Sequence, residues 1–348
     1  MINELFSDFT GENFLRFCFY RNGNVCKDSP FCGMSVRSAG SMRFRWNKKN
    51  PLRDKFLGKI SGAGGESALA SVNVSETDSG GASGSVSAAT YENASGSVSA
   101  ATSEACICVP TPVPVELIHS KIVYDVYDSE DTFSLQGDGI ITKNKMLMPV
   151  VTVADCMPIF LFDDKSGVFG IVHSGWKGTG IIGEAIALAE KNYGSKAEDF
   201  CVILGPHIRK CCYIVNKERA DYFAANFGTD CITPLEDGGS CYCGGKGLPV
   251  DWNNGNGRLF RLSLETANLE VLKIAGVKEE NITVYKDCTC CDERLGSNRR
   301  ETATANANSV ASAKTSGTAA TSTVSPLKIK QPAPFTVQAA FISWCPKH

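Results

Sequence analysis

The feature that most constrains the fold is a pair of short apolar runs joined by a polar turn. Ile159–Phe162 and Val168–Val172 flank an Asp-Asp-Lys-Ser-Gly segment, a pattern that predicts a β-hairpin. Cys156 comes just before this hairpin and His173 just after it. Because adjacent antiparallel strands hold the two ends of a hairpin within about 5 Å of each other, we expect the thiol and the imidazole to lie side by side.

A glycine-rich turn follows His173 and leads into 181–193, where apolar residues recur at the helical period. Free N–H groups at the start of a helix favour an anion. The turn therefore predicts an anion cradle beside the Cys–His pair, with Lys177 adding a positive charge. Its N–H groups would come from Gly175, Gly178, Thr179 and Gly180. A thiol, an imidazole and an anion cradle together indicate a functional site.

The composition sets the broad class of protein. The chain has 348 residues, 43% of them hydrophobic, which is enough for one large or two small domains. A net charge of −2 gives no electrostatic case for nucleic-acid binding. No apolar run reaches membrane-spanning length, and the N-terminal segment lacks the cationic start and apolar core of a signal peptide. We therefore expect a soluble cytoplasmic protein without a membrane partner.

Apolar periodicity and capping residues predict the other elements. Strands are expected at 114–126, 148–153, 200–204, 282–285 and 335–344, and His119 lies near the centre of the first. Helices are expected from about Asn50, over 217–227 and over 262–275, and Asn216 is the expected cap of the second. Strands and helices alternate without a strict βαβ rhythm, which favours an α+β fold with mixed sheets.

Two segments are low in complexity. Gly, Ser, Ala, Thr and Asn dominate 61–105 and 301–325, and the nonamer ASGSVSAAT occurs at 82–90 and again at 94–102. Such segments cannot bury enough apolar surface to order themselves. We expect both to be disordered insertions, which a fold tolerates because long surface loops add little closure entropy.

The chain carries sixteen cysteines, many for a protein without a secretion signal, in which a disulfide framework is not expected. Only Cys288 and Cys291 have the C-x-x-C spacing, and no second such pair accompanies them as in a zinc ribbon. Cys241 and Cys243 could bind a metal together with the cysteines at 288, 290 and 291. The alternative is that these residues are small buried side chains and loop thiols.

Three motifs carry a resemblance to a known family: Ala-Asp-Cys-Met-Pro at 154–158, His-Ser-Gly-Trp-Lys-Gly at 173–178, and Gly-Pro-His at 205–207 followed by Cys212-Tyr213. In this order they resemble the multicopper polyphenol oxidase (laccase-domain) family, whose members are also described as purine nucleoside phosphorylases and peptidoglycan editing factors. The resemblance implies one catalytic domain over 1–348, interrupted by the two insertions. It also implies two mixed β-sheets packed together with flanking helices, similar to the cysteine-hydrolase-toxin fold.

The resemblance also implies a site. The family's zinc ligands, which are also its catalytic residues, fall on His119, Cys156 and His173. Substrate contacts are implied for Gly175, Trp176, Lys177, Gly178, His207, Arg299 and Arg300. The sequence departs from the family pattern at several places: His119 lacks the usual preceding glutamine, Lys177 replaces an arginine, Ile214 a glutamate and Asn298 an aromatic residue.

Each of the supporting residues has a structural alternative. Trp176 stacks on a purine or packs as an ordinary indole, and His207 touches substrate or caps a turn. Arg299 and Arg300 bind phosphate through their planar guanidinium groups or are solvated. Asp155 orients a ligand or bonds the backbone of its turn. Asp138 is expected to be a turn residue rather than a catalytic base.

Two imidazoles, one thiolate and an open position are typical of a catalytic zinc site, and zinc lowers the pKa of bound water to about 7. Copper is chemically compatible with the thiolate, but a chain with four histidines lacks enough of them for a multicopper oxidase. We expect a zinc-dependent purine nucleoside phosphorylase that acts on adenosine-like nucleosides and phosphate, with adenosine deamination as a second activity. The alternatives are a zinc or cysteine amidase editing peptidoglycan precursors, with Cys156 as nucleophile and His173 as its base, and a non-catalytic metal-binding protein.

Overall fold

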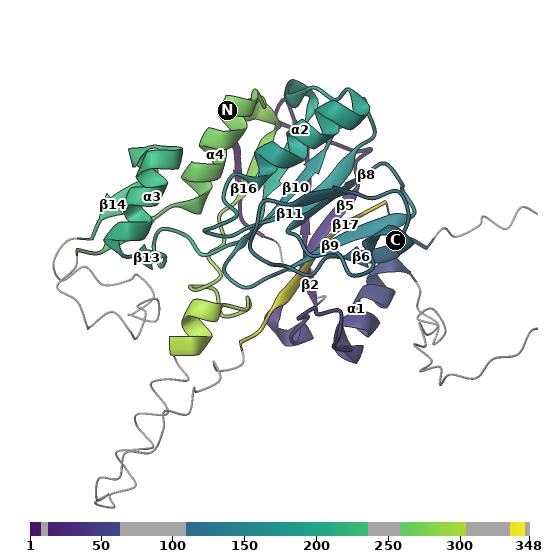
Figure 1. Ribbon diagram of the computed structural model, residues 1–348, viewed down its shortest axis with the longest axis horizontal. Helices are drawn as coiled ribbons and strands as arrows, with labels where there is room; N and C mark the ends of the chain where they lie inside the picture. Colours follow the sequence, from purple (N-terminus) through teal and green to yellow (C-terminus); the bar gives the residue numbers. More distant parts are fainter. Residues whose placement is uncertain (8–12, 63–108, 236–257, 304–334, 345–348) are drawn as a thin grey trace, which may run out of the picture.

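Two mixed β-sheets form the framework of the protein (Figure 1). The computed structural model describes residues 1–7, 13–62, 109–235, 258–303 and 335–344. In spatial order, the seven-stranded sheet contains β1 (Asn3–Leu5), β16 (Ile282–Tyr285), β12 (Cys201–Leu204), β10 (Met157–Phe162), β11 (Phe169–Ser174), β8 (Gly139–Thr142) and β7 (Val123–Asp125). The five-stranded sheet contains β2 (Phe14–Phe17), β5 (Phe31–Ser35), β17 (Gln338–Ser343), β9 (Leu147–Val153) and β6 (Thr111–Pro114).

Two smaller sheets, the helices α1 to α4, a helical segment at 298–303 and several short 3-10 helices complete the described fold. The smaller sheets are β13 (Ile214–Val215), β15 (Phe260–Leu262) and β14 (Ile232–Pro234), and the pair β3 (Tyr20–Arg21) and β4 (Asn24–Val25). The helices are α1 (Pro51–Ser61), α2 (Ile181–Tyr193), α3 (Lys217–Phe227) and α4 (Leu264–Ala275). Among the residues that the structure describes, no helix is long and apolar enough to cross a membrane.

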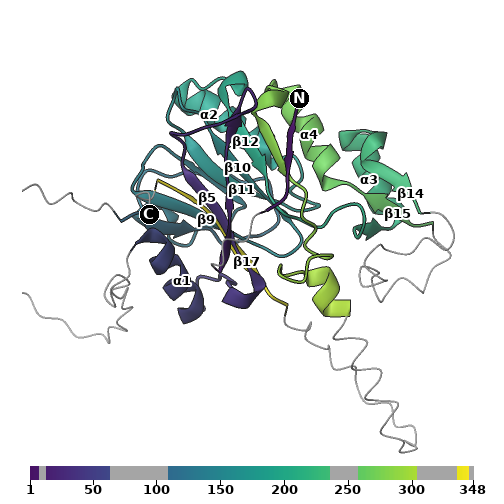
Figure 2. The ribbon, with the colours of Figure 1, turned by 180° about the vertical axis from the view of Figure 1, so that it is seen from behind.

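The two large sheets pack face to face, and helices cover their outer faces (Figures 1 and 2). Along β10, Ile159 and Leu161 join the core beneath α2 and α4, whereas Phe160 and Phe162 join the core between the sheets. Successive side chains of a strand point to opposite faces, so a strand buried on both faces must be apolar throughout. This requirement explains the continuous apolar run that marks the hairpin in the sequence.

The outer face of the five-stranded sheet is covered by α1. Leu57 and Ile60 of this helix pack with Met148 of β9 and Phe341 of β17. The helix begins at Pro51, directly after Asn50, whose side-chain oxygen accepts a hydrogen bond from the N–H of Arg53 at 3.2 Å. An asparagine cap followed by proline is a typical helix start. The prediction of a basic helix from about Asn50 is therefore confirmed.

Most of the predicted elements are confirmed. The hairpin forms between β10 and β11, with Pro158 paired to His173, and α2 and α3 have the predicted bounds. Asn216 caps α3 by accepting a hydrogen bond from the N–H of Arg219 at 3.0 Å. The helix α4 starts two residues later than predicted, since Leu262 belongs to β15 and Ser263 is the cap.

The prediction of a strand around His119 is wrong. The backbone of His119 has a φ of 59°, a left-handed conformation that a strand cannot contain. The expected strand is instead two short ones, β6 and β7, which belong to different sheets. The crossing of the chain between the sheets puts His119 in a bend.

The expected insertions fall largely outside the described residues, at 63–105 and 304–325. Cys241 and Cys243 also lie outside them. The edges of the insertions belong to the fold: Ser61 ends α1, and the N–H of Glu301 donates to the carbonyl of Ser297 at 3.0 Å in a helical turn.

The close packing of β8 against β11 can be tested at Gly170. An alanine Cβ at this position would collide with the carbonyl oxygen of Ile140 and lie 2.9 Å from the Cα of Ile141. Because both atoms belong to the paired backbone of β8, Gly170→Ala should lower the free energy of unfolding by about 3 kcal/mol. Urea denaturation followed by circular dichroism measures the loss.

Gly58→Ala is the matched control. Gly58 lies in α1, and a Cβ added there would have no atom within 4 Å beyond its own helix backbone and chain neighbours. The substitution should therefore leave stability unchanged or raise it by up to about 1 kcal/mol. Equal urea midpoints for the two variants would contradict the described contact between β8 and β11.

Candidate metal centre

Three side chains from different parts of the chain converge at one end of the seven-stranded sheet. One ligand atom from each of His119, Cys156 and His173 lies within 4.8 Å of the others. His119 comes from the bend after β6, Cys156 from the turn between β9 and β10, and His173 from β11. The two imidazole centroids are 5.1 Å apart. The three predicted metal ligands are thus brought together.

Asp138 holds two of these ligands in place. Its Oδ1 lies 2.9 Å from Nδ1 of His173 and accepts a hydrogen bond from the N–H of His119 at 3.0 Å. Its Oδ2 accepts a hydrogen bond from the hydroxyl of Ser120 at 2.7 Å. The carboxylate is completely buried. Since Nδ1 of His173 faces this carboxylate, Nε2 is left to face a metal, the arrangement usual for metal-binding histidines.

The ionised forms of Asp138 and His173 stabilise each other. Burial opposes ionisation of Asp138, but the hydrogen bonds from His173 and Ser120 hold the pKa of its carboxyl below the usual value. Burial would likewise lower the pKa of His173, but the Cys156 thiolate and the Asp138 carboxylate raise it to about 10. Burial and repulsion by His173 lower the pKa of His119. The neutral form of His119 that metal binding requires is therefore the favoured one.

Asp155 fixes the turn that carries Cys156. Its backbone has a φ of 79°, a strained conformation that persists only where its surroundings hold it. Its carboxylate accepts hydrogen bonds from the hydroxyl of Thr289 at 2.7 Å and from the N–H of Arg299 at 2.6 Å, and its carbonyl accepts one from the N–H of Ile208 at 2.9 Å. Both of the roles considered for Asp155 are therefore combined: it bonds backbone, and by doing so it positions the ligand that follows.

Gly175 and Gly178 are required by close approach. A Cβ on Gly175 would lie 2.9 Å from Sγ of Cys156 and 3.5 Å from Cε1 of His173. A Cβ on Gly178 would lie 2.6 Å from the carbonyl oxygen of Ser120. The first glycine leaves room for the sulfur, and the second lets the His119 bend pack against the turn after β11.

One of the four N–H groups expected to form an anion cradle, that of Gly180, points into the fold, as do N–H groups in the first turn of α2. The N–H of Ile181 donates to the carbonyl of Gly178, and that of Gly183 to the carbonyl of Gly180, both at 3.0 Å. The N–H of Gly180 points to Oδ1 of Asn268 at 3.5 Å. The start of α2 is therefore tied into the fold, because α4 packs against it and supplies Asn268. An anion cradle formed by the N–H groups of Gly175, Gly178 and Thr179 stays a prediction.

Cationic and aromatic side chains gather around Trp176, which follows the ligand His173 by three residues. The guanidinium carbon of Arg219 lies 4.3 Å from the centroid of Trp176, and Nζ of Lys177 lies 5.4 Å from it. Nη1 of Arg219 donates to the hydroxyl of Tyr213 at 3.4 Å. Tyr213 is 7% exposed, and its burial raises the pKa of the phenol.

The remaining predicted contacts separate into two groups. Arg299 lies near the site, with its guanidinium carbon 5.6 Å from the centroid of Tyr213 and its Nη1 donating to the carbonyl of Ile214. Arg300 is buried and donates to the carbonyls of Thr289, Cys290, Asp292 and Leu295. These donors hold the 289–295 loop, and a substrate contact of Arg300 stays a prediction.

His207 is also a structural group. It is 1% exposed, and its Nδ1 lies 2.9 Å from the carbonyl oxygen of Gly205. Burial lowers the pKa of His207 to about 4. These contacts fit the structural alternative, in which His207 fixes its own turn, better than they fit a contact with substrate.

Sequence reasoning missed the importance of Asp138, Tyr213 and Arg219. The signal for Asp138 was its place in Gly-Asp-Gly directly before a strand, but its meaning depends on β8 pairing with β11, which sets Gly139 opposite Val172. Tyr213 belongs to a quoted motif, yet only the fold brings it to the guanidinium groups of Arg219 and Arg299. Arg219 has no sequence signal, since it reads as an ordinary polar residue in the first turn of a helix.

The chain is similar to proteins named for nucleoside chemistry. YlmD of Geobacillus stearothermophilus, named a purine nucleoside phosphorylase, is 31% identical over 170 residues, 48% of this chain and 56% of that protein. A purine nucleoside phosphorylase of Aquifex aeolicus is 31% identical over 186 residues, 53% of this chain and 73% of the relative. The adenosine deaminase RL5, from an unknown prokaryotic organism, is 29% identical over 185 residues, 50% of this chain and 64% of the relative. In sequence, the chain matches about half the length of YlmD.

The fold agrees with these similarities. The crystal structure of YlmD matches with a TM-score of 0.59 at 19% identity, covering 97% of this chain and 98% of that one, which shows a shared fold. A family model described as multi-copper polyphenol oxidoreductase laccase matches residues 74–312, more than half of the chain. The chain therefore belongs to the multi-copper polyphenol oxidoreductase laccase family.

Proposed function

We propose that the protein is a zinc-dependent purine nucleoside phosphorylase that acts on adenosine-like nucleosides. The observation that carries the proposal is the convergence of His119, Cys156 and His173, supported by the names of the relatives. Three protein ligands leave a fourth position for a water or substrate atom. His119 is exposed and Cys156 is half-buried, so substrate reaches the group from the side of the His119 bend.

The donor set favours zinc over copper. One thiolate and two imidazoles suit zinc, whereas several copper ions would need more histidines than this part of the chain supplies. Among the described residues the third histidine, His207, is buried in a turn away from this group. When bound, zinc would supply a positive charge that polarises an oxygen of the substrate or of phosphate.

Phosphate binding is assigned to side chains rather than to the start of α2. Lys177, Arg219 and Arg299 surround Trp176 and Tyr213, so an anion beside Cys156 would meet several positive charges. A guanidinium binds phosphate oxygens in a bidentate manner. Trp176 is 36% exposed, which leaves part of its indole to stack on a purine. These groups would hold nucleoside and phosphate together, which is the main contribution of positioning to such a reaction.

Deamination of adenosine is proposed as the second activity of the same site. One of the relatives is named an adenosine deaminase. The hydrolytic reaction needs water in place of phosphate at the open position. Whether nucleoside is cleaved or deaminated then depends on whether phosphate occupies the cationic side of the site.

A cysteine amidase is the second candidate, and one observation favours it. Without a metal, the sulfur of Cys156 lies within 4.8 Å of a ring nitrogen of His173, whose Nδ1 lies 2.9 Å from Oδ1 of Asp138. A nucleophile, its base and an acid that orients the base are the parts of a cysteine hydrolase. Metal binding and this use of the residues exclude each other, because both need the same sulfur and the same ring nitrogen.

Product analysis tests the proposed reaction. Adenosine incubated with the purified protein should give adenine and ribose 1-phosphate only when phosphate is supplied. Cys156→Ala should lower the rate by more than about a hundredfold, since losing a metal ligand costs at least as much as losing a residue that supports one. Cys18→Ala is the control, because Cys18 is an exposed cysteine just after β2, and it should retain full activity.

Three other outcomes would change the proposal. Inosine formed equally well without phosphate would assign hydrolytic deamination as the main activity. Activity on a muramyl-peptide amide that survives a chelator but not alkylation of Cys156 would assign the cysteine amidase. Wild-type turnover by Cys156→Ala would contradict both the zinc enzyme and the cysteine amidase, because each requires the sulfur of Cys156.

The support given by Asp138 can be tested through metal affinity. Asp138→Asn keeps the size of the side chain but removes the charge that orients His173, so zinc affinity should fall about 10- to 100-fold in competition with a chromophoric chelator. Asp163→Asn is the control, since Asp163 is equally buried but lies in the loop at the far end of the hairpin. Equal zinc affinities for the two variants would show that Asp138 does not act on the metal centre.

A further inference from the structure

Four cysteine sulfurs form a second group, distinct from the three ligands of the candidate metal centre. Cys211 and Cys212 follow β12, Cys288 and Cys291 follow β16, and their Sγ atoms all lie within 4.8 Å of one another. The two segments meet because β12 and β16 are parallel neighbours, with Val202 beside Ile282, so both chains leave the sheet at the same edge. We call these four residues the cysteine cluster.

The separations within the cluster match those around one tetrahedral metal ion. Sγ of Cys291 lies 3.7 Å from that of Cys211 and 3.2 Å from that of Cys212, and the sulfurs of Cys211 and Cys212 are 3.6 Å apart. Zinc bonded to four thiolates at about 2.3 Å places the sulfurs about 3.8 Å apart. A disulfide would use only two of the four thiols and would leave the other two without a role.

The backbone around the cluster is already folded into two turns. The N–H of Cys212 donates to the carbonyl of Arg209 at 2.9 Å, and that of Cys291 to the carbonyl of Cys288 at 3.1 Å. The N–H of Arg209 donates to Sγ of Cys288 at 3.5 Å. Hydrogen bonds to ligand atoms orient them and stabilise their charged form. The cluster therefore has supporting contacts of the kind that metal sites use.

We propose that Cys211, Cys212, Cys288 and Cys291 bind one structural zinc ion. Four protein ligands leave no position for substrate, so the site is structural rather than catalytic. Binding converts four thiols to thiolates, releases up to four protons to solvent, and involves no oxidant. Cys291 is exposed, which gives the ion a route from solvent.

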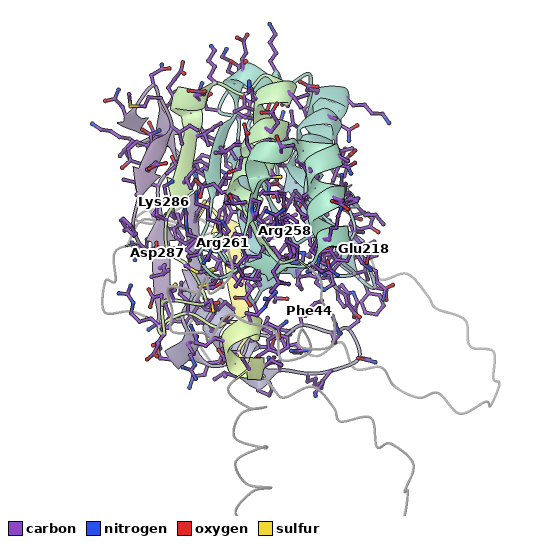
Figure 3. All side chains as sticks on the ribbon, turned by 90° about the vertical axis from the view of Figure 1, so that its left-hand side faces the viewer. Phe44, Glu218, Arg258, Arg261, Lys286 and Asp287 are labelled. Carbon is purple, nitrogen blue, oxygen red and sulfur yellow. The ribbon has the colours of Figure 1, made fainter. Side chains whose placement is uncertain are left out.

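Cations near the cluster offset the negative charge of a tetrathiolate. The Arg261 guanidinium donates to the carbonyl of Cys211 at 2.8 Å, and that of Arg300 to the carbonyl of Cys290 at 3.1 Å. Figure 3 views the molecule from a side on which Arg261 and the Lys286–Asp287 segment leading to Cys288 are labelled. Two arginines bound to carbonyls of cysteines in or beside the cluster suit an anionic metal complex.

The ion would join the loops that hold the first site. Ile208, just before Cys211, donates its N–H to the carbonyl of Asp155, and Thr289, just after Cys288, donates its hydroxyl to the Asp155 carboxylate. Asp155 in turn precedes the ligand Cys156. The cluster thus acts at a distance as a positioning element for the turn of Cys156.

Metal analysis of the full-length protein tests the proposal. Freshly purified protein should contain about two zinc ions per chain. Cys291→Ser and His119→Ala should each remove one, and the double variant should remove both. Cys231→Ser is the control, because Cys231 is a buried cysteine bonded to the carbonyl of Gly228 in another loop, and it should keep both ions.

A measurement on the wild type covers the case in which a variant fails to fold. Cobalt(II) added to the metal-free protein at two equivalents should give thiolate-to-metal charge-transfer absorption of two kinds. The stronger should come from the tetrathiolate site and the weaker from the single thiolate of Cys156.

The outcomes separate this proposal from the proposed active site. Zinc content that Cys291→Ser leaves unchanged and His119→Ala lowers would overturn the cysteine site while the first metal stands. The reverse pattern would support the cysteine site and count against the first. A Cys212–Cys291 disulfide found by peptide mapping of freshly purified protein alkylated without reductant would also overturn the proposal.

Discussion

The buried carboxylate of Asp138 is the contact on which the candidate metal centre depends. It joins Nδ1 of His173, which belongs to a rigid central strand, to the backbone of His119, which belongs to a bend with a left-handed φ. A buried charge without partners would be costly, but here each oxygen is hydrogen-bonded. The need to satisfy this charge holds the bend against the sheet, and the bend supplies a ligand that no regular element could place there.

The packing of the two large sheets determines where a polar site can lie. β10 and β11 are buried on both faces, so their interiors admit only apolar side chains, and chemistry is confined to the sheet end, where Cys156 and His173 emerge. The same end receives the loops after β12 and β16. The candidate metal centre and the cysteine cluster are consequently neighbours through Asp155, and both depend on the order of strands in one sheet.

The family name refers to several copper ions and to polyphenols, whereas the side chains of the candidate metal centre suit a single metal ion. In the proposed function, two imidazoles and one thiolate hold a single ion, and nearby cations and aromatic rings hold a phosphate and a planar base. The relatives named for nucleoside chemistry agree with this interpretation. The comparison illustrates that function follows from the site and not from the name attached to a fold.

Local sequence determined much of this protein. The apolar runs of the hairpin, the asparagine caps of α1 and α3 and the glycine after α4 each act over a few residues, so their elements could be predicted from the chain alone. The pairing of Cys156 with His173 was predictable for the same reason, because a hairpin brings together residues close in sequence. His119 was assigned by resemblance, and its backbone conformation was predicted wrongly.

Only the tertiary structure decided the contacts between distant segments. Asp138 contacts His173 because β8 pairs with β11. Asp155 contacts Thr289 and Arg299, which lie more than a hundred residues further along the chain. The cysteine cluster forms because β12 and β16 are parallel neighbours. The sequence shows a single C-x-x-C pair and no partner for it. Strand order is a property of the whole core. Residues that it brings together are far apart in the sequence, so no local sequence pattern predicts their contact.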